Sequence, residues 1–263
     1  MVEWLFSLPI WVVALVLGGF CWVCTSLGAL SVFFCQNLNK KYVSIMLAFA
    51  GGIMIASSFF SLILPALEFC GGVVWKEVVF VVVGFLLGTL FIVVTNILFD
   101  KKFSERLKEH NARRKSLLIT TSITMHNIPE GMAVGVAIGG AMVTGDITML
   151  LATIALAVGI GIQNIPEGAS IALALKCQGV KTGKAFWVGV LSGVVEPIFA
   201  IVASVLTVYI LGVLPAFLAF SAGAMMLVAI TELLPEALEE NKLLSVIFFA
   251  VGFAVMALCD VVL

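Results

Sequence analysis

The sequence predicts an all-α, polytopic membrane protein, and three observations carry that prediction. The 263 residues are 62% hydrophobic and 11% charged, with a mean hydropathy of +1.23, which is too apolar for a soluble core alone. The apolar residues form runs of about 20 or more, the length of a helix that crosses the hydrocarbon of a bilayer. The runs are too long and too continuous for the alternating strands of an outer-membrane barrel.

Eight such runs follow one another, which predicts eight transmembrane helices in a single domain, 1–263. One polar segment, 100–116, separates the first three runs from the other five and is predicted to be a cytoplasmic loop. Glycines within the runs favour close packing of helix against helix. The expected helices lie near residues 9–34, 43–66, 73–99, 117–140, 148–175, 185–209, 213–235 and 243–262.

Positive charges predict the orientation. Nearly all lysines and arginines fall in alternate loops, with Lys76 on the other side, and the positive-inside bias makes those loops cytoplasmic. Both the N-terminus and the C-terminus are therefore expected on the non-cytoplasmic side. The residues that set this orientation are Lys40, Lys41, the segment 101–115, Lys176, Lys181, Lys184 and Lys242.

The first run is expected to be a retained span, because Glu3 stands where a cleaved signal would have basic residues. Cys21 and Cys24 lie one helical turn apart in it, a spacing that binds metal or cycles redox in other proteins. No second pair accompanies them, and the scattered cysteines of the chain are read mainly as small buried hydrophobes.

A repeated block marks the fourth and fifth runs. His-Asn-Ile-Pro-Glu-Gly at 126–131 recurs as Gln-Asn-Ile-Pro-Glu-Gly at 163–168. Consecutive helices are antiparallel, so the repeat predicts inverted symmetry, and 50–56 and 222–228 in the second and seventh runs echo one another weakly. An inverted arrangement of three, two and three helices with a midplane site is typical of secondary transporters.

Ionisable groups lie deep in three of the expected helices. Counted from the nearest cytoplasmic Lys or Arg at about 1.5 Å per residue, His126 is about 16 Å deep, Glu167 about 14 Å and Glu196 about 18 Å. A carboxylate at the bilayer centre costs roughly 2.5 to 3.5 kcal/mol on insertion scales, so such residues indicate function. Folding of a lipid-soluble bundle requires no such layer, whereas passage of a cation does.

The residue types indicate a divalent metal. His126 and Glu130 are four residues apart and share one helical surface, as Gln163 and Glu167 do on the next helix. Pro129 and its counterpart free a backbone carbonyl or kink the helix. Imidazole, carboxylate and amide ligands suit Zn²⁺, Cd²⁺, Fe²⁺ and Mn²⁺. The more specific hypothesis is a site for two ions that are bridged by the two motif glutamates, with Asn127, Asn164 and Glu196 beside the second ion.

Three alternatives to this site are less consistent with the sequence. A lone buried histidine and a Pro-Glu-Gly kink with a protonated glutamic acid explain one copy of the motif, but not two copies and Glu196-Pro197 at matching depth. A cation/Ca²⁺ exchanger is disfavoured by His126, because Ca²⁺ takes oxygen ligands. An intramembrane metalloprotease normally needs His-Glu-x-x-His, and the chain has only His110 and His126, so no enzyme is expected.

At these residues the chain resembles the ZIP (Zrt- and Irt-like) family of divalent metal transporters, in its compact bacterial-type branch. The resemblance covers essentially the whole chain: eight helices, the paired motifs, the acidic residue before proline in the sixth helix, and Glu-Leu-Leu-Pro-Glu near the end of the seventh. It implies one metal at His126, Glu130, Gln163, Glu167 and Met54, and a second at Asn127, Asn164 and Glu196 with the shared glutamates. It also implies an entrance at Ser61 and Asp260 and an exit at Glu232 and Glu236.

The resemblance implies uptake into the cytoplasm by alternating access, with helices 1, 4, 5 and 6 moving against 2, 3, 7 and 8. A channel-like flux of the metal is the alternative mechanism. The divalent metal is substrate, no cofactor and no nucleic-acid partner are expected, and a homodimer in the plasma membrane, or the bacterial inner membrane, is compatible. Gln163 replaces a second histidine of many relatives, so strict zinc selectivity is not implied.

Overall fold

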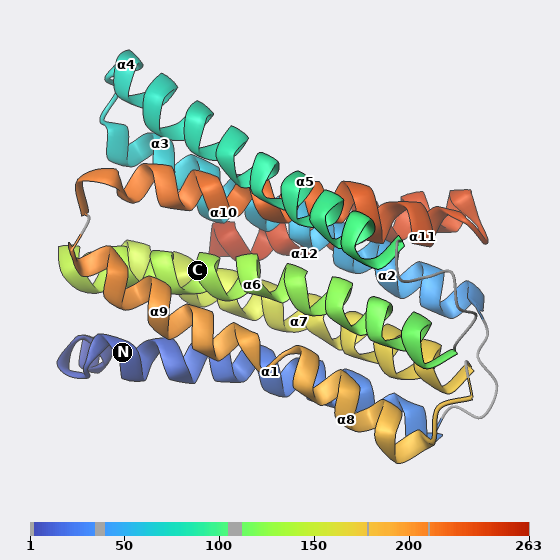
Figure 1. Cartoon of the computed structure of the whole chain (residues 1–263). Coiled ribbons are helices and arrows are strands. Elements are labelled where there is room, and N and C mark those ends of the chain that lie inside the picture. Colours follow the sequence, from blue (N-terminus) through green and yellow to red (C-terminus); the bar gives the residue numbers. More distant parts are fainter. Residues whose placement is uncertain (1–2, 35–39, 105–111, 178, 210, 263) are drawn as a thin grey trace.

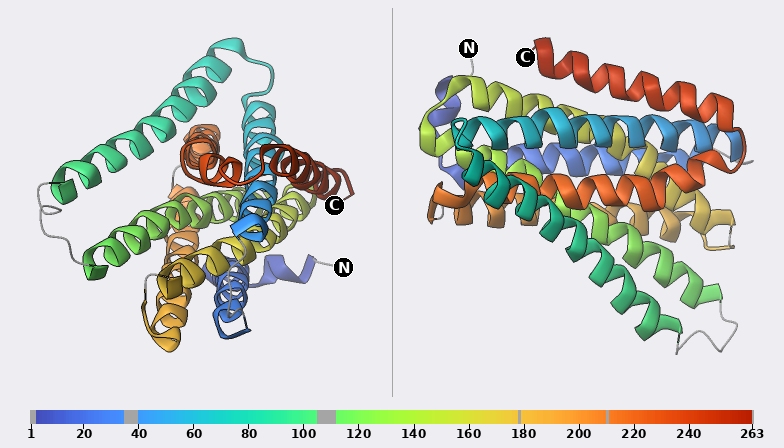
Figure 2. Two further views of the ribbon diagram at one scale, coloured as in Figure 1. Left: turned by 90° about the vertical axis from the view of Figure 1, so that its right-hand side faces the viewer. Right: turned by 90° about the horizontal axis from the view of Figure 1, so that it is seen from above.

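The computed structural model is a bundle of long helices, with no strand in residues 3–34, 40–104, 112–177, 179–209 and 211–262, which it describes (Figure 1). At some of these residues, His126 and Glu232 among them, the backbone is described and the side chain is not. The predicted all-α class is confirmed. Figure 2 shows the same helices in two further views, with the N-terminal and C-terminal ends marked.

Most helices cross the whole bundle, and some are built from consecutive pieces. The elements η2, η3 and η5 are π-helical turns within such composite helices. The elements are η1 Glu3–Ser7, α1 Ile10–Phe34, α2 Lys40–Ser57, η2 Ser58–Ile63, α3 Leu64–Cys70, α4 Val74–Lys76, η3 Glu77–Val82, α5 Val83–Ser104, α6 Ala112–Thr144, α7 Ile147–Cys177, α8 Thr182–Ser192, α9 Val195–Tyr209, η4 Leu211–Val213, α10 Leu214–Val228, η5 Ala229–Leu233, α11 Leu234–Leu238 and α12 Lys242–Val262.

Within the described residues, seven single or composite helices are long and apolar enough to cross a membrane. They are Ile10–Phe34, Ser44–Cys70, Val74–Leu98, Ile147–Leu173, Thr182–Tyr209, Leu214–Leu238 and Lys242–Asp260. The polytopic membrane class therefore holds. The 33-residue α6 is the remaining long helix, and the side chains of its first half lie outside the described residues.

Two of the predicted boundaries need correction. The predicted loop 100–116 is narrower, because α5 continues to Ser104 and α6 begins at Ala112, and their lysines and arginines are good helix formers. The predicted sixth helix, 185–209, is two helices, α8 and α9, with an interruption after Ser192. The interruption follows from Pro197 and is described below with the site.

The helices pack in two groups. The first group consists of α1, α6, α7, α8 and α9, in which α1 packs against α7 and α9, and α6 packs against α9. The second group consists of α2, α3, α5, α10, α11 and α12, in which α2 packs against α12, and α10 against α5. The groups meet where α2 lies against α7 and α10 against α6. Figure 1 shows the first group in its lower half and the second in its upper half.

Reciprocal glycine contacts define the helix crossings of the second group. A Cβ atom added at Gly52 of α2 would overlap the carbonyl oxygen of Phe249 in α12, and one at Gly252 of α12 would overlap that of Phe49 in α2. Each helix thus offers its partner a Phe-x-x-Gly segment, which lets the backbones approach closely. Gly88 and Gly223 make the same exchange with Phe220 and Phe85 between α5 and α10. The likeness of the two crossings is what an inverted repeat would produce.

Prolines account for two of the π-helical turns. Pro65 and Pro235 cannot donate a backbone hydrogen bond to the carbonyls of Ser61 and Thr231, four residues earlier. The turns η2 and η5 contain those two carbonyls and end just before Leu-Pro. The helix therefore widens locally and does not break.

Candidate metal site

The repeated motif lies at the centre of the first group. Pro129 and Pro166 sit inside α6 and α7, and both helices continue through them. The polar side chains of the motif are buried, with exposed fractions between 0% and 4%. These buried side chains are Asn127, Glu130, Gln163, Asn164 and Glu167.

One hydrogen bond joins the two copies. The amide Nε2 of Gln163 donates to Oε1 of Glu130 over 2.8 Å, which links α7 to α6. Glu167 follows Gln163 by four residues and so shares its helical face. The two motif glutamates are therefore brought to the same interface, as the sequence predicts.

Glu196 of α9 lies next to the asparagines of both motif copies and is fully buried. Its Oε1 accepts hydrogen bonds from Nδ2 of Asn127 over 3.1 Å and from Oγ1 of Thr25 over 3.0 Å. Its Oε2 accepts one from Nδ2 of Asn164 over 2.7 Å. One carboxylate thus connects α1, α6, α7 and α9 through three neutral donors.

Both asparagine amides are fixed in orientation. Nδ2 of Asn127 also donates to the carbonyl oxygen of Ser192 over 3.2 Å, and Nδ2 of Asn164 to that of Cys21 over 3.4 Å. Each amide nitrogen therefore has two acceptors for its two hydrogens. The two Oδ1 atoms are consequently the ends of these amides that face away from Glu196.

The backbone around Glu196 is interrupted, and Pro197 is the reason. Pro197 has no N–H for the carbonyl of Gly193, and the N–H of Glu196 bonds that carbonyl over 3.0 Å instead. This shift leaves the carbonyl oxygens of Val190 and Ser192 without their helical donors. Side chains replace them: Nε1 of Trp22 donates to Val190 over 2.8 Å, and Asn127 donates to Ser192.

Four buried oxygen atoms of the site have no hydrogen-bond partner among the described residues. They belong to three amides and one carboxylate, and all accept but do not donate. Leaving such an acceptor buried and unpaired costs about 1–3 kcal/mol, so a site with four of them is suited to a cation. The atoms are Oδ1 of Asn127, Oε2 of Glu130, Oε1 of Gln163 and Oδ1 of Asn164.

Within the residues whose side chains are described, no three of His, Cys, Asp and Glu come together as a metal-binding group. Glu130, Glu167 and Glu196 are therefore not a compact cluster of carboxylates. The amide of Gln163 donates to Glu130, and the amides of Asn127 and Asn164 donate to Glu196. Such spacing limits the repulsion of three negative charges in a low dielectric.

The other residues predicted to contact metal fall in different places. His126 lies in α6, one residue before Asn127, and its side chain is outside the described set. Met54 of α2 is completely buried in the cluster that also contains Ile160 of α7. The adjacent Ile53 faces Gly159 of α7, so this part of α2 borders the site.

The predicted entrance residues meet each other, and the predicted exit residues are only partly described. Ser61 of η2 donates through Oγ to Oδ1 of Asp260 of α12 over 3.1 Å. Glu236 lies exposed in α11. Glu232 has no described side chain.

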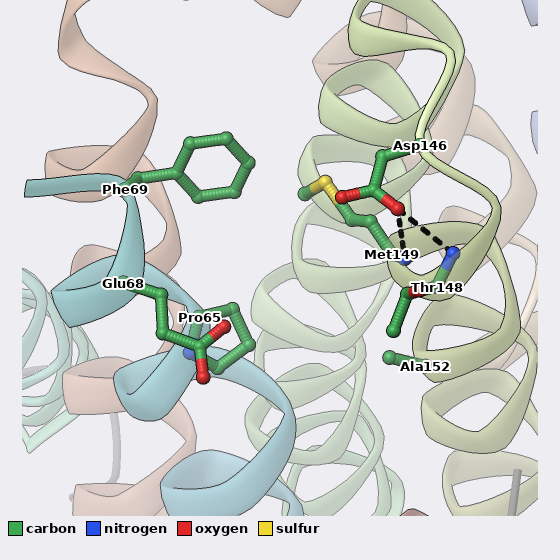
Figure 3. A pocket seen from close by; sticks show the side chains of 7 residues that line it. All are labelled: Pro65, Glu68, Phe69, Asp146, Thr148, Met149 and Ala152. Atoms are coloured by element: carbon green, nitrogen blue, oxygen red, sulfur yellow. Dashed lines mark hydrogen bonds between the residues drawn. The ribbon is translucent and has the colours of Figure 1, made fainter. Parts of the chain in front are cut away.

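A cavity of about 250 Å³ opens at the end of the bundle where α3 meets the α6–α7 turn (Figure 3). It is lined by seven residues, among them the acidic side chains of Glu68 and Asp146. Asp146 caps α7, because its Oδ1 accepts from the backbone N–H of Thr148 over 2.8 Å and of Met149 over 3.3 Å. Sequence reasoning did not identify this cavity.

Sequence reasoning also missed Thr25 and Trp22, which contact the interrupted helix from α1. Both stand in an apolar run, and their partners are 171 and 168 residues away in the chain. The interruption itself had a signal, because Glu196-Pro197 predicts a lost helical hydrogen bond four residues earlier.

Known proteins with similar sequences share one description. The sequence profile described as ZIP Zinc transporter matches residues 100–260. The chain is 30% identical to "Zinc transporter ZIP11" of Homo sapiens, covering 92% of this chain and 94% of that protein. It is 34% identical to "Zinc transporter ZIPB" of Bordetella bronchiseptica, over 94% and 81%, and 33% identical to "Zinc transporter GufA" of Myxococcus xanthus, over 81% and 83%.

Proposed function

Because the chain belongs to the ZIP zinc transporter family, a family of membrane transporters and not of enzymes, we propose that it carries divalent transition-metal cations, Zn²⁺ first, into the cytoplasm. The protein is an integral membrane protein of the plasma membrane, or of the inner membrane in a bacterium. The observation that carries the proposal is the four buried oxygens of α6 and α7 that have no hydrogen-bond partner among the described residues.

The proposed ligands divide into two neighbouring sets. One ion would take His126, Glu130, Gln163 and Glu167, with Met54 approaching from the second group. The other would take Asn127, Asn164 and Glu196 with the shared glutamates. Oxygens without a partner in the described part of the chain occur in both sets, which supports two ions over one.

The proposed ligands are mostly oxygen and amide, so selectivity should be broad. Gln163 is a neutral donor, and the carboxylates Glu130 and Glu167 suit Mn²⁺ and Fe²⁺ as well as Zn²⁺ and Cd²⁺. The metal is cargo here, and no resident cofactor is proposed.

The proposed mechanism is alternating access between the two helix groups. The midplane site lies in the first group, apart from Met54, and the groups contact each other along fewer faces than the helices within each group do. We propose α6 as the eighth span, both termini on the non-cytoplasmic side, and three-plus-two-plus-three inverted repeats. The reciprocal Phe-x-x-Gly crossings support the inverted repeats. The bilayer is the environment, and a homodimer stays a prediction.

The deciding experiment is uptake into proteoliposomes that contain the purified protein. Wild-type protein is expected to give saturable Zn²⁺ and Cd²⁺ uptake, because each transporter has a limited number of metal-binding sites. His126→Ala and Glu167→Ala are expected to lose at least about 90% of it, since each removes a ligand from a closed set. Flux that rises linearly with metal concentration would instead indicate a channel, and binding without flux would contradict transport.

The cavity of Figure 3 is the proposed outer vestibule, where two carboxylates raise the local cation concentration. The double variant Glu68→Gln with Asp146→Asn is expected to raise KM for Zn²⁺ about three- to tenfold at low salt, with Vmax unchanged. Asparagine still caps α7, so the fold is retained. Rates are measured at low and at physiological ionic strength.

Glu239→Gln, which removes a charge from the other end of the bundle, serves as the control for net charge. An equal rise in KM for that variant, or no loss of the effect in salt, would argue against a vestibule.

A further inference from the structure

The carboxylate of Glu196 offers its two oxygens unequally. A carboxylate oxygen has about two lone-pair positions for hydrogen bonds or metal. Oε1 already accepts from Thr25 and from Asn127, so both of its positions are used. Oε2 accepts only from Asn164 among the described residues and keeps one position.

Thr25 is built into this arrangement. Its side chain is 1% exposed, and its hydroxyl has one hydrogen with two acceptors in reach, the carbonyl oxygen of Cys21 at 3.2 Å and Oε1 of Glu196 at 3.0 Å. The bond to the carboxyl group is the shorter of the two, and it is charge-assisted when Glu196 is ionised. The hydroxyl therefore donates to Glu196.

Gly193 borders this contact closely. A Cβ atom added at Gly193 would lie 2.9 Å from Oε1 of Glu196 and 3.0 Å from Oγ1 of Thr25. The glycine at the helix interruption thus leaves just enough room for the hydroxyl and the carboxylate. Trp22, one turn before Thr25, holds the other side of the interruption through Val190. α1 therefore hydrogen-bonds both to a backbone carbonyl and to a side chain of the segment around the interruption.

We propose that Thr25 is a specificity-determining positioning residue, which saturates Oε1 and so restricts Glu196 to a single oxygen for a metal ion. This inference rests on the proposed function. Zn²⁺ prefers four ligands at short distance and is served by one carboxylate oxygen. Larger ions with more ligands, such as Ca²⁺, commonly take a carboxylate through both oxygens. Thr25 thereby favours small ions over large ones at the second position.

The test compares Thr25→Val, which is isosteric and cannot donate, with Thr25→Ser, which can. Zn²⁺, Mn²⁺ and Ca²⁺ uptake are measured in proteoliposomes, and the quantity of interest is Vmax/KM for each ion relative to Zn²⁺. Thr25→Val is expected to raise the Mn²⁺ and Ca²⁺ ratios about three- to tenfold, the scale of the net contribution of one ordinary hydrogen bond. Thr25→Ser is expected to restore the wild-type ratios, which a purely structural loss would not do.

The double variant Thr25→Val with Glu196→Gln locates the effect. If Thr25 acts through Glu196, adding Thr25→Val to Glu196→Gln leaves the ion ratios within about twofold of Glu196→Gln alone. Unchanged ratios in Thr25→Val, failure of Thr25→Ser to restore them, or equal shifts in both backgrounds would overturn the inference. Absence of any uptake by the wild-type protein would instead overturn the proposed function, so the two failures are distinguishable.

Discussion

Glu130→Gln is expected to lower Zn²⁺ uptake by about 100-fold or more, beyond the 10- to 100-fold that loss of an outer partner costs a metal site. Glutamine keeps the size of the side chain and an acceptor for Nε2 of Gln163. It removes the negative charge that compensates a divalent ion in a low dielectric. Initial rates in proteoliposomes and Zn²⁺ affinity in detergent measure the effect.

Two comparisons make this result interpretable. Glu239→Gln removes a carboxylate from an exposed turn and is expected to transport like the wild type. Glu196→Ala is expected to alter the rate or the selectivity and to leave measurable uptake, because Glu196 belongs to the second proposed ion. Equal, mild losses in Glu130→Gln and Glu196→Ala would refute this ranking of the two positions.

Gly168→Ala is expected to destabilise the protein by about 1–3 kcal/mol, the cost of overpacking a close-packed contact. A Cβ atom at Gly168 would overlap the carbonyl oxygen of Thr25 and lie 3.2 Å from the backbone nitrogen of Ala29. Both obstacles are backbone atoms, so α1 and α7 must separate. Because Thr25 moves with α1, the hydrogen bond to Glu196 should be disturbed as well.

The measurement is the thermal unfolding midpoint of the purified protein in detergent. Gly19→Ala in α1 is the matched control, because a Cβ atom there meets nothing within 4 Å and alanine is the better helix former. Gly19→Ala is expected to unfold at the wild-type temperature or above it. Similar midpoints for the two alanine variants would show that the contact between α1 and α7 is less tight than described.

Local sequence patterns predicted the helices, whereas their exact ends and interruptions depend on the environment and on tertiary packing. Apolar runs and charged loops predicted the helical class and the approximate spans, because the bilayer sets the length of a helix. The predicted loop 100–116 failed at its edges because lysine and arginine sustain a helix in water as well. The break before Glu196 was missed although Pro197 predicts one, since Glu196-Pro197 was considered only for the depth of its carboxylate.

In the candidate site, too, some residues could be predicted from local sequence and others only from tertiary packing. The repeated motif identified Glu130, Gln163 and the two asparagines, since polar residues in an apolar run are conspicuous in any sequence. Thr25 was not conspicuous, because a threonine in a membrane helix normally bonds its own backbone, and Thr25 does lie 3.2 Å from the carbonyl of Cys21. Only the packing of α1 against α9 reveals its second acceptor.

The partners of α1 also bear on how the chain matures in the membrane. α1 precedes α7 by more than 100 residues in the chain, yet it packs mainly against α7 and α9, so these contacts can form only after those later helices have been made. Until then its hydroxyls need partners within the helix itself. Thr25 can bond the carbonyl of Cys21, and Ser26 bonds that of Trp22 over 2.9 Å. Packing of α1 against α9 then brings the Thr25 hydroxyl to Glu196, so the same contact that joins the two helices also completes the hydrogen bonds of that carboxylate.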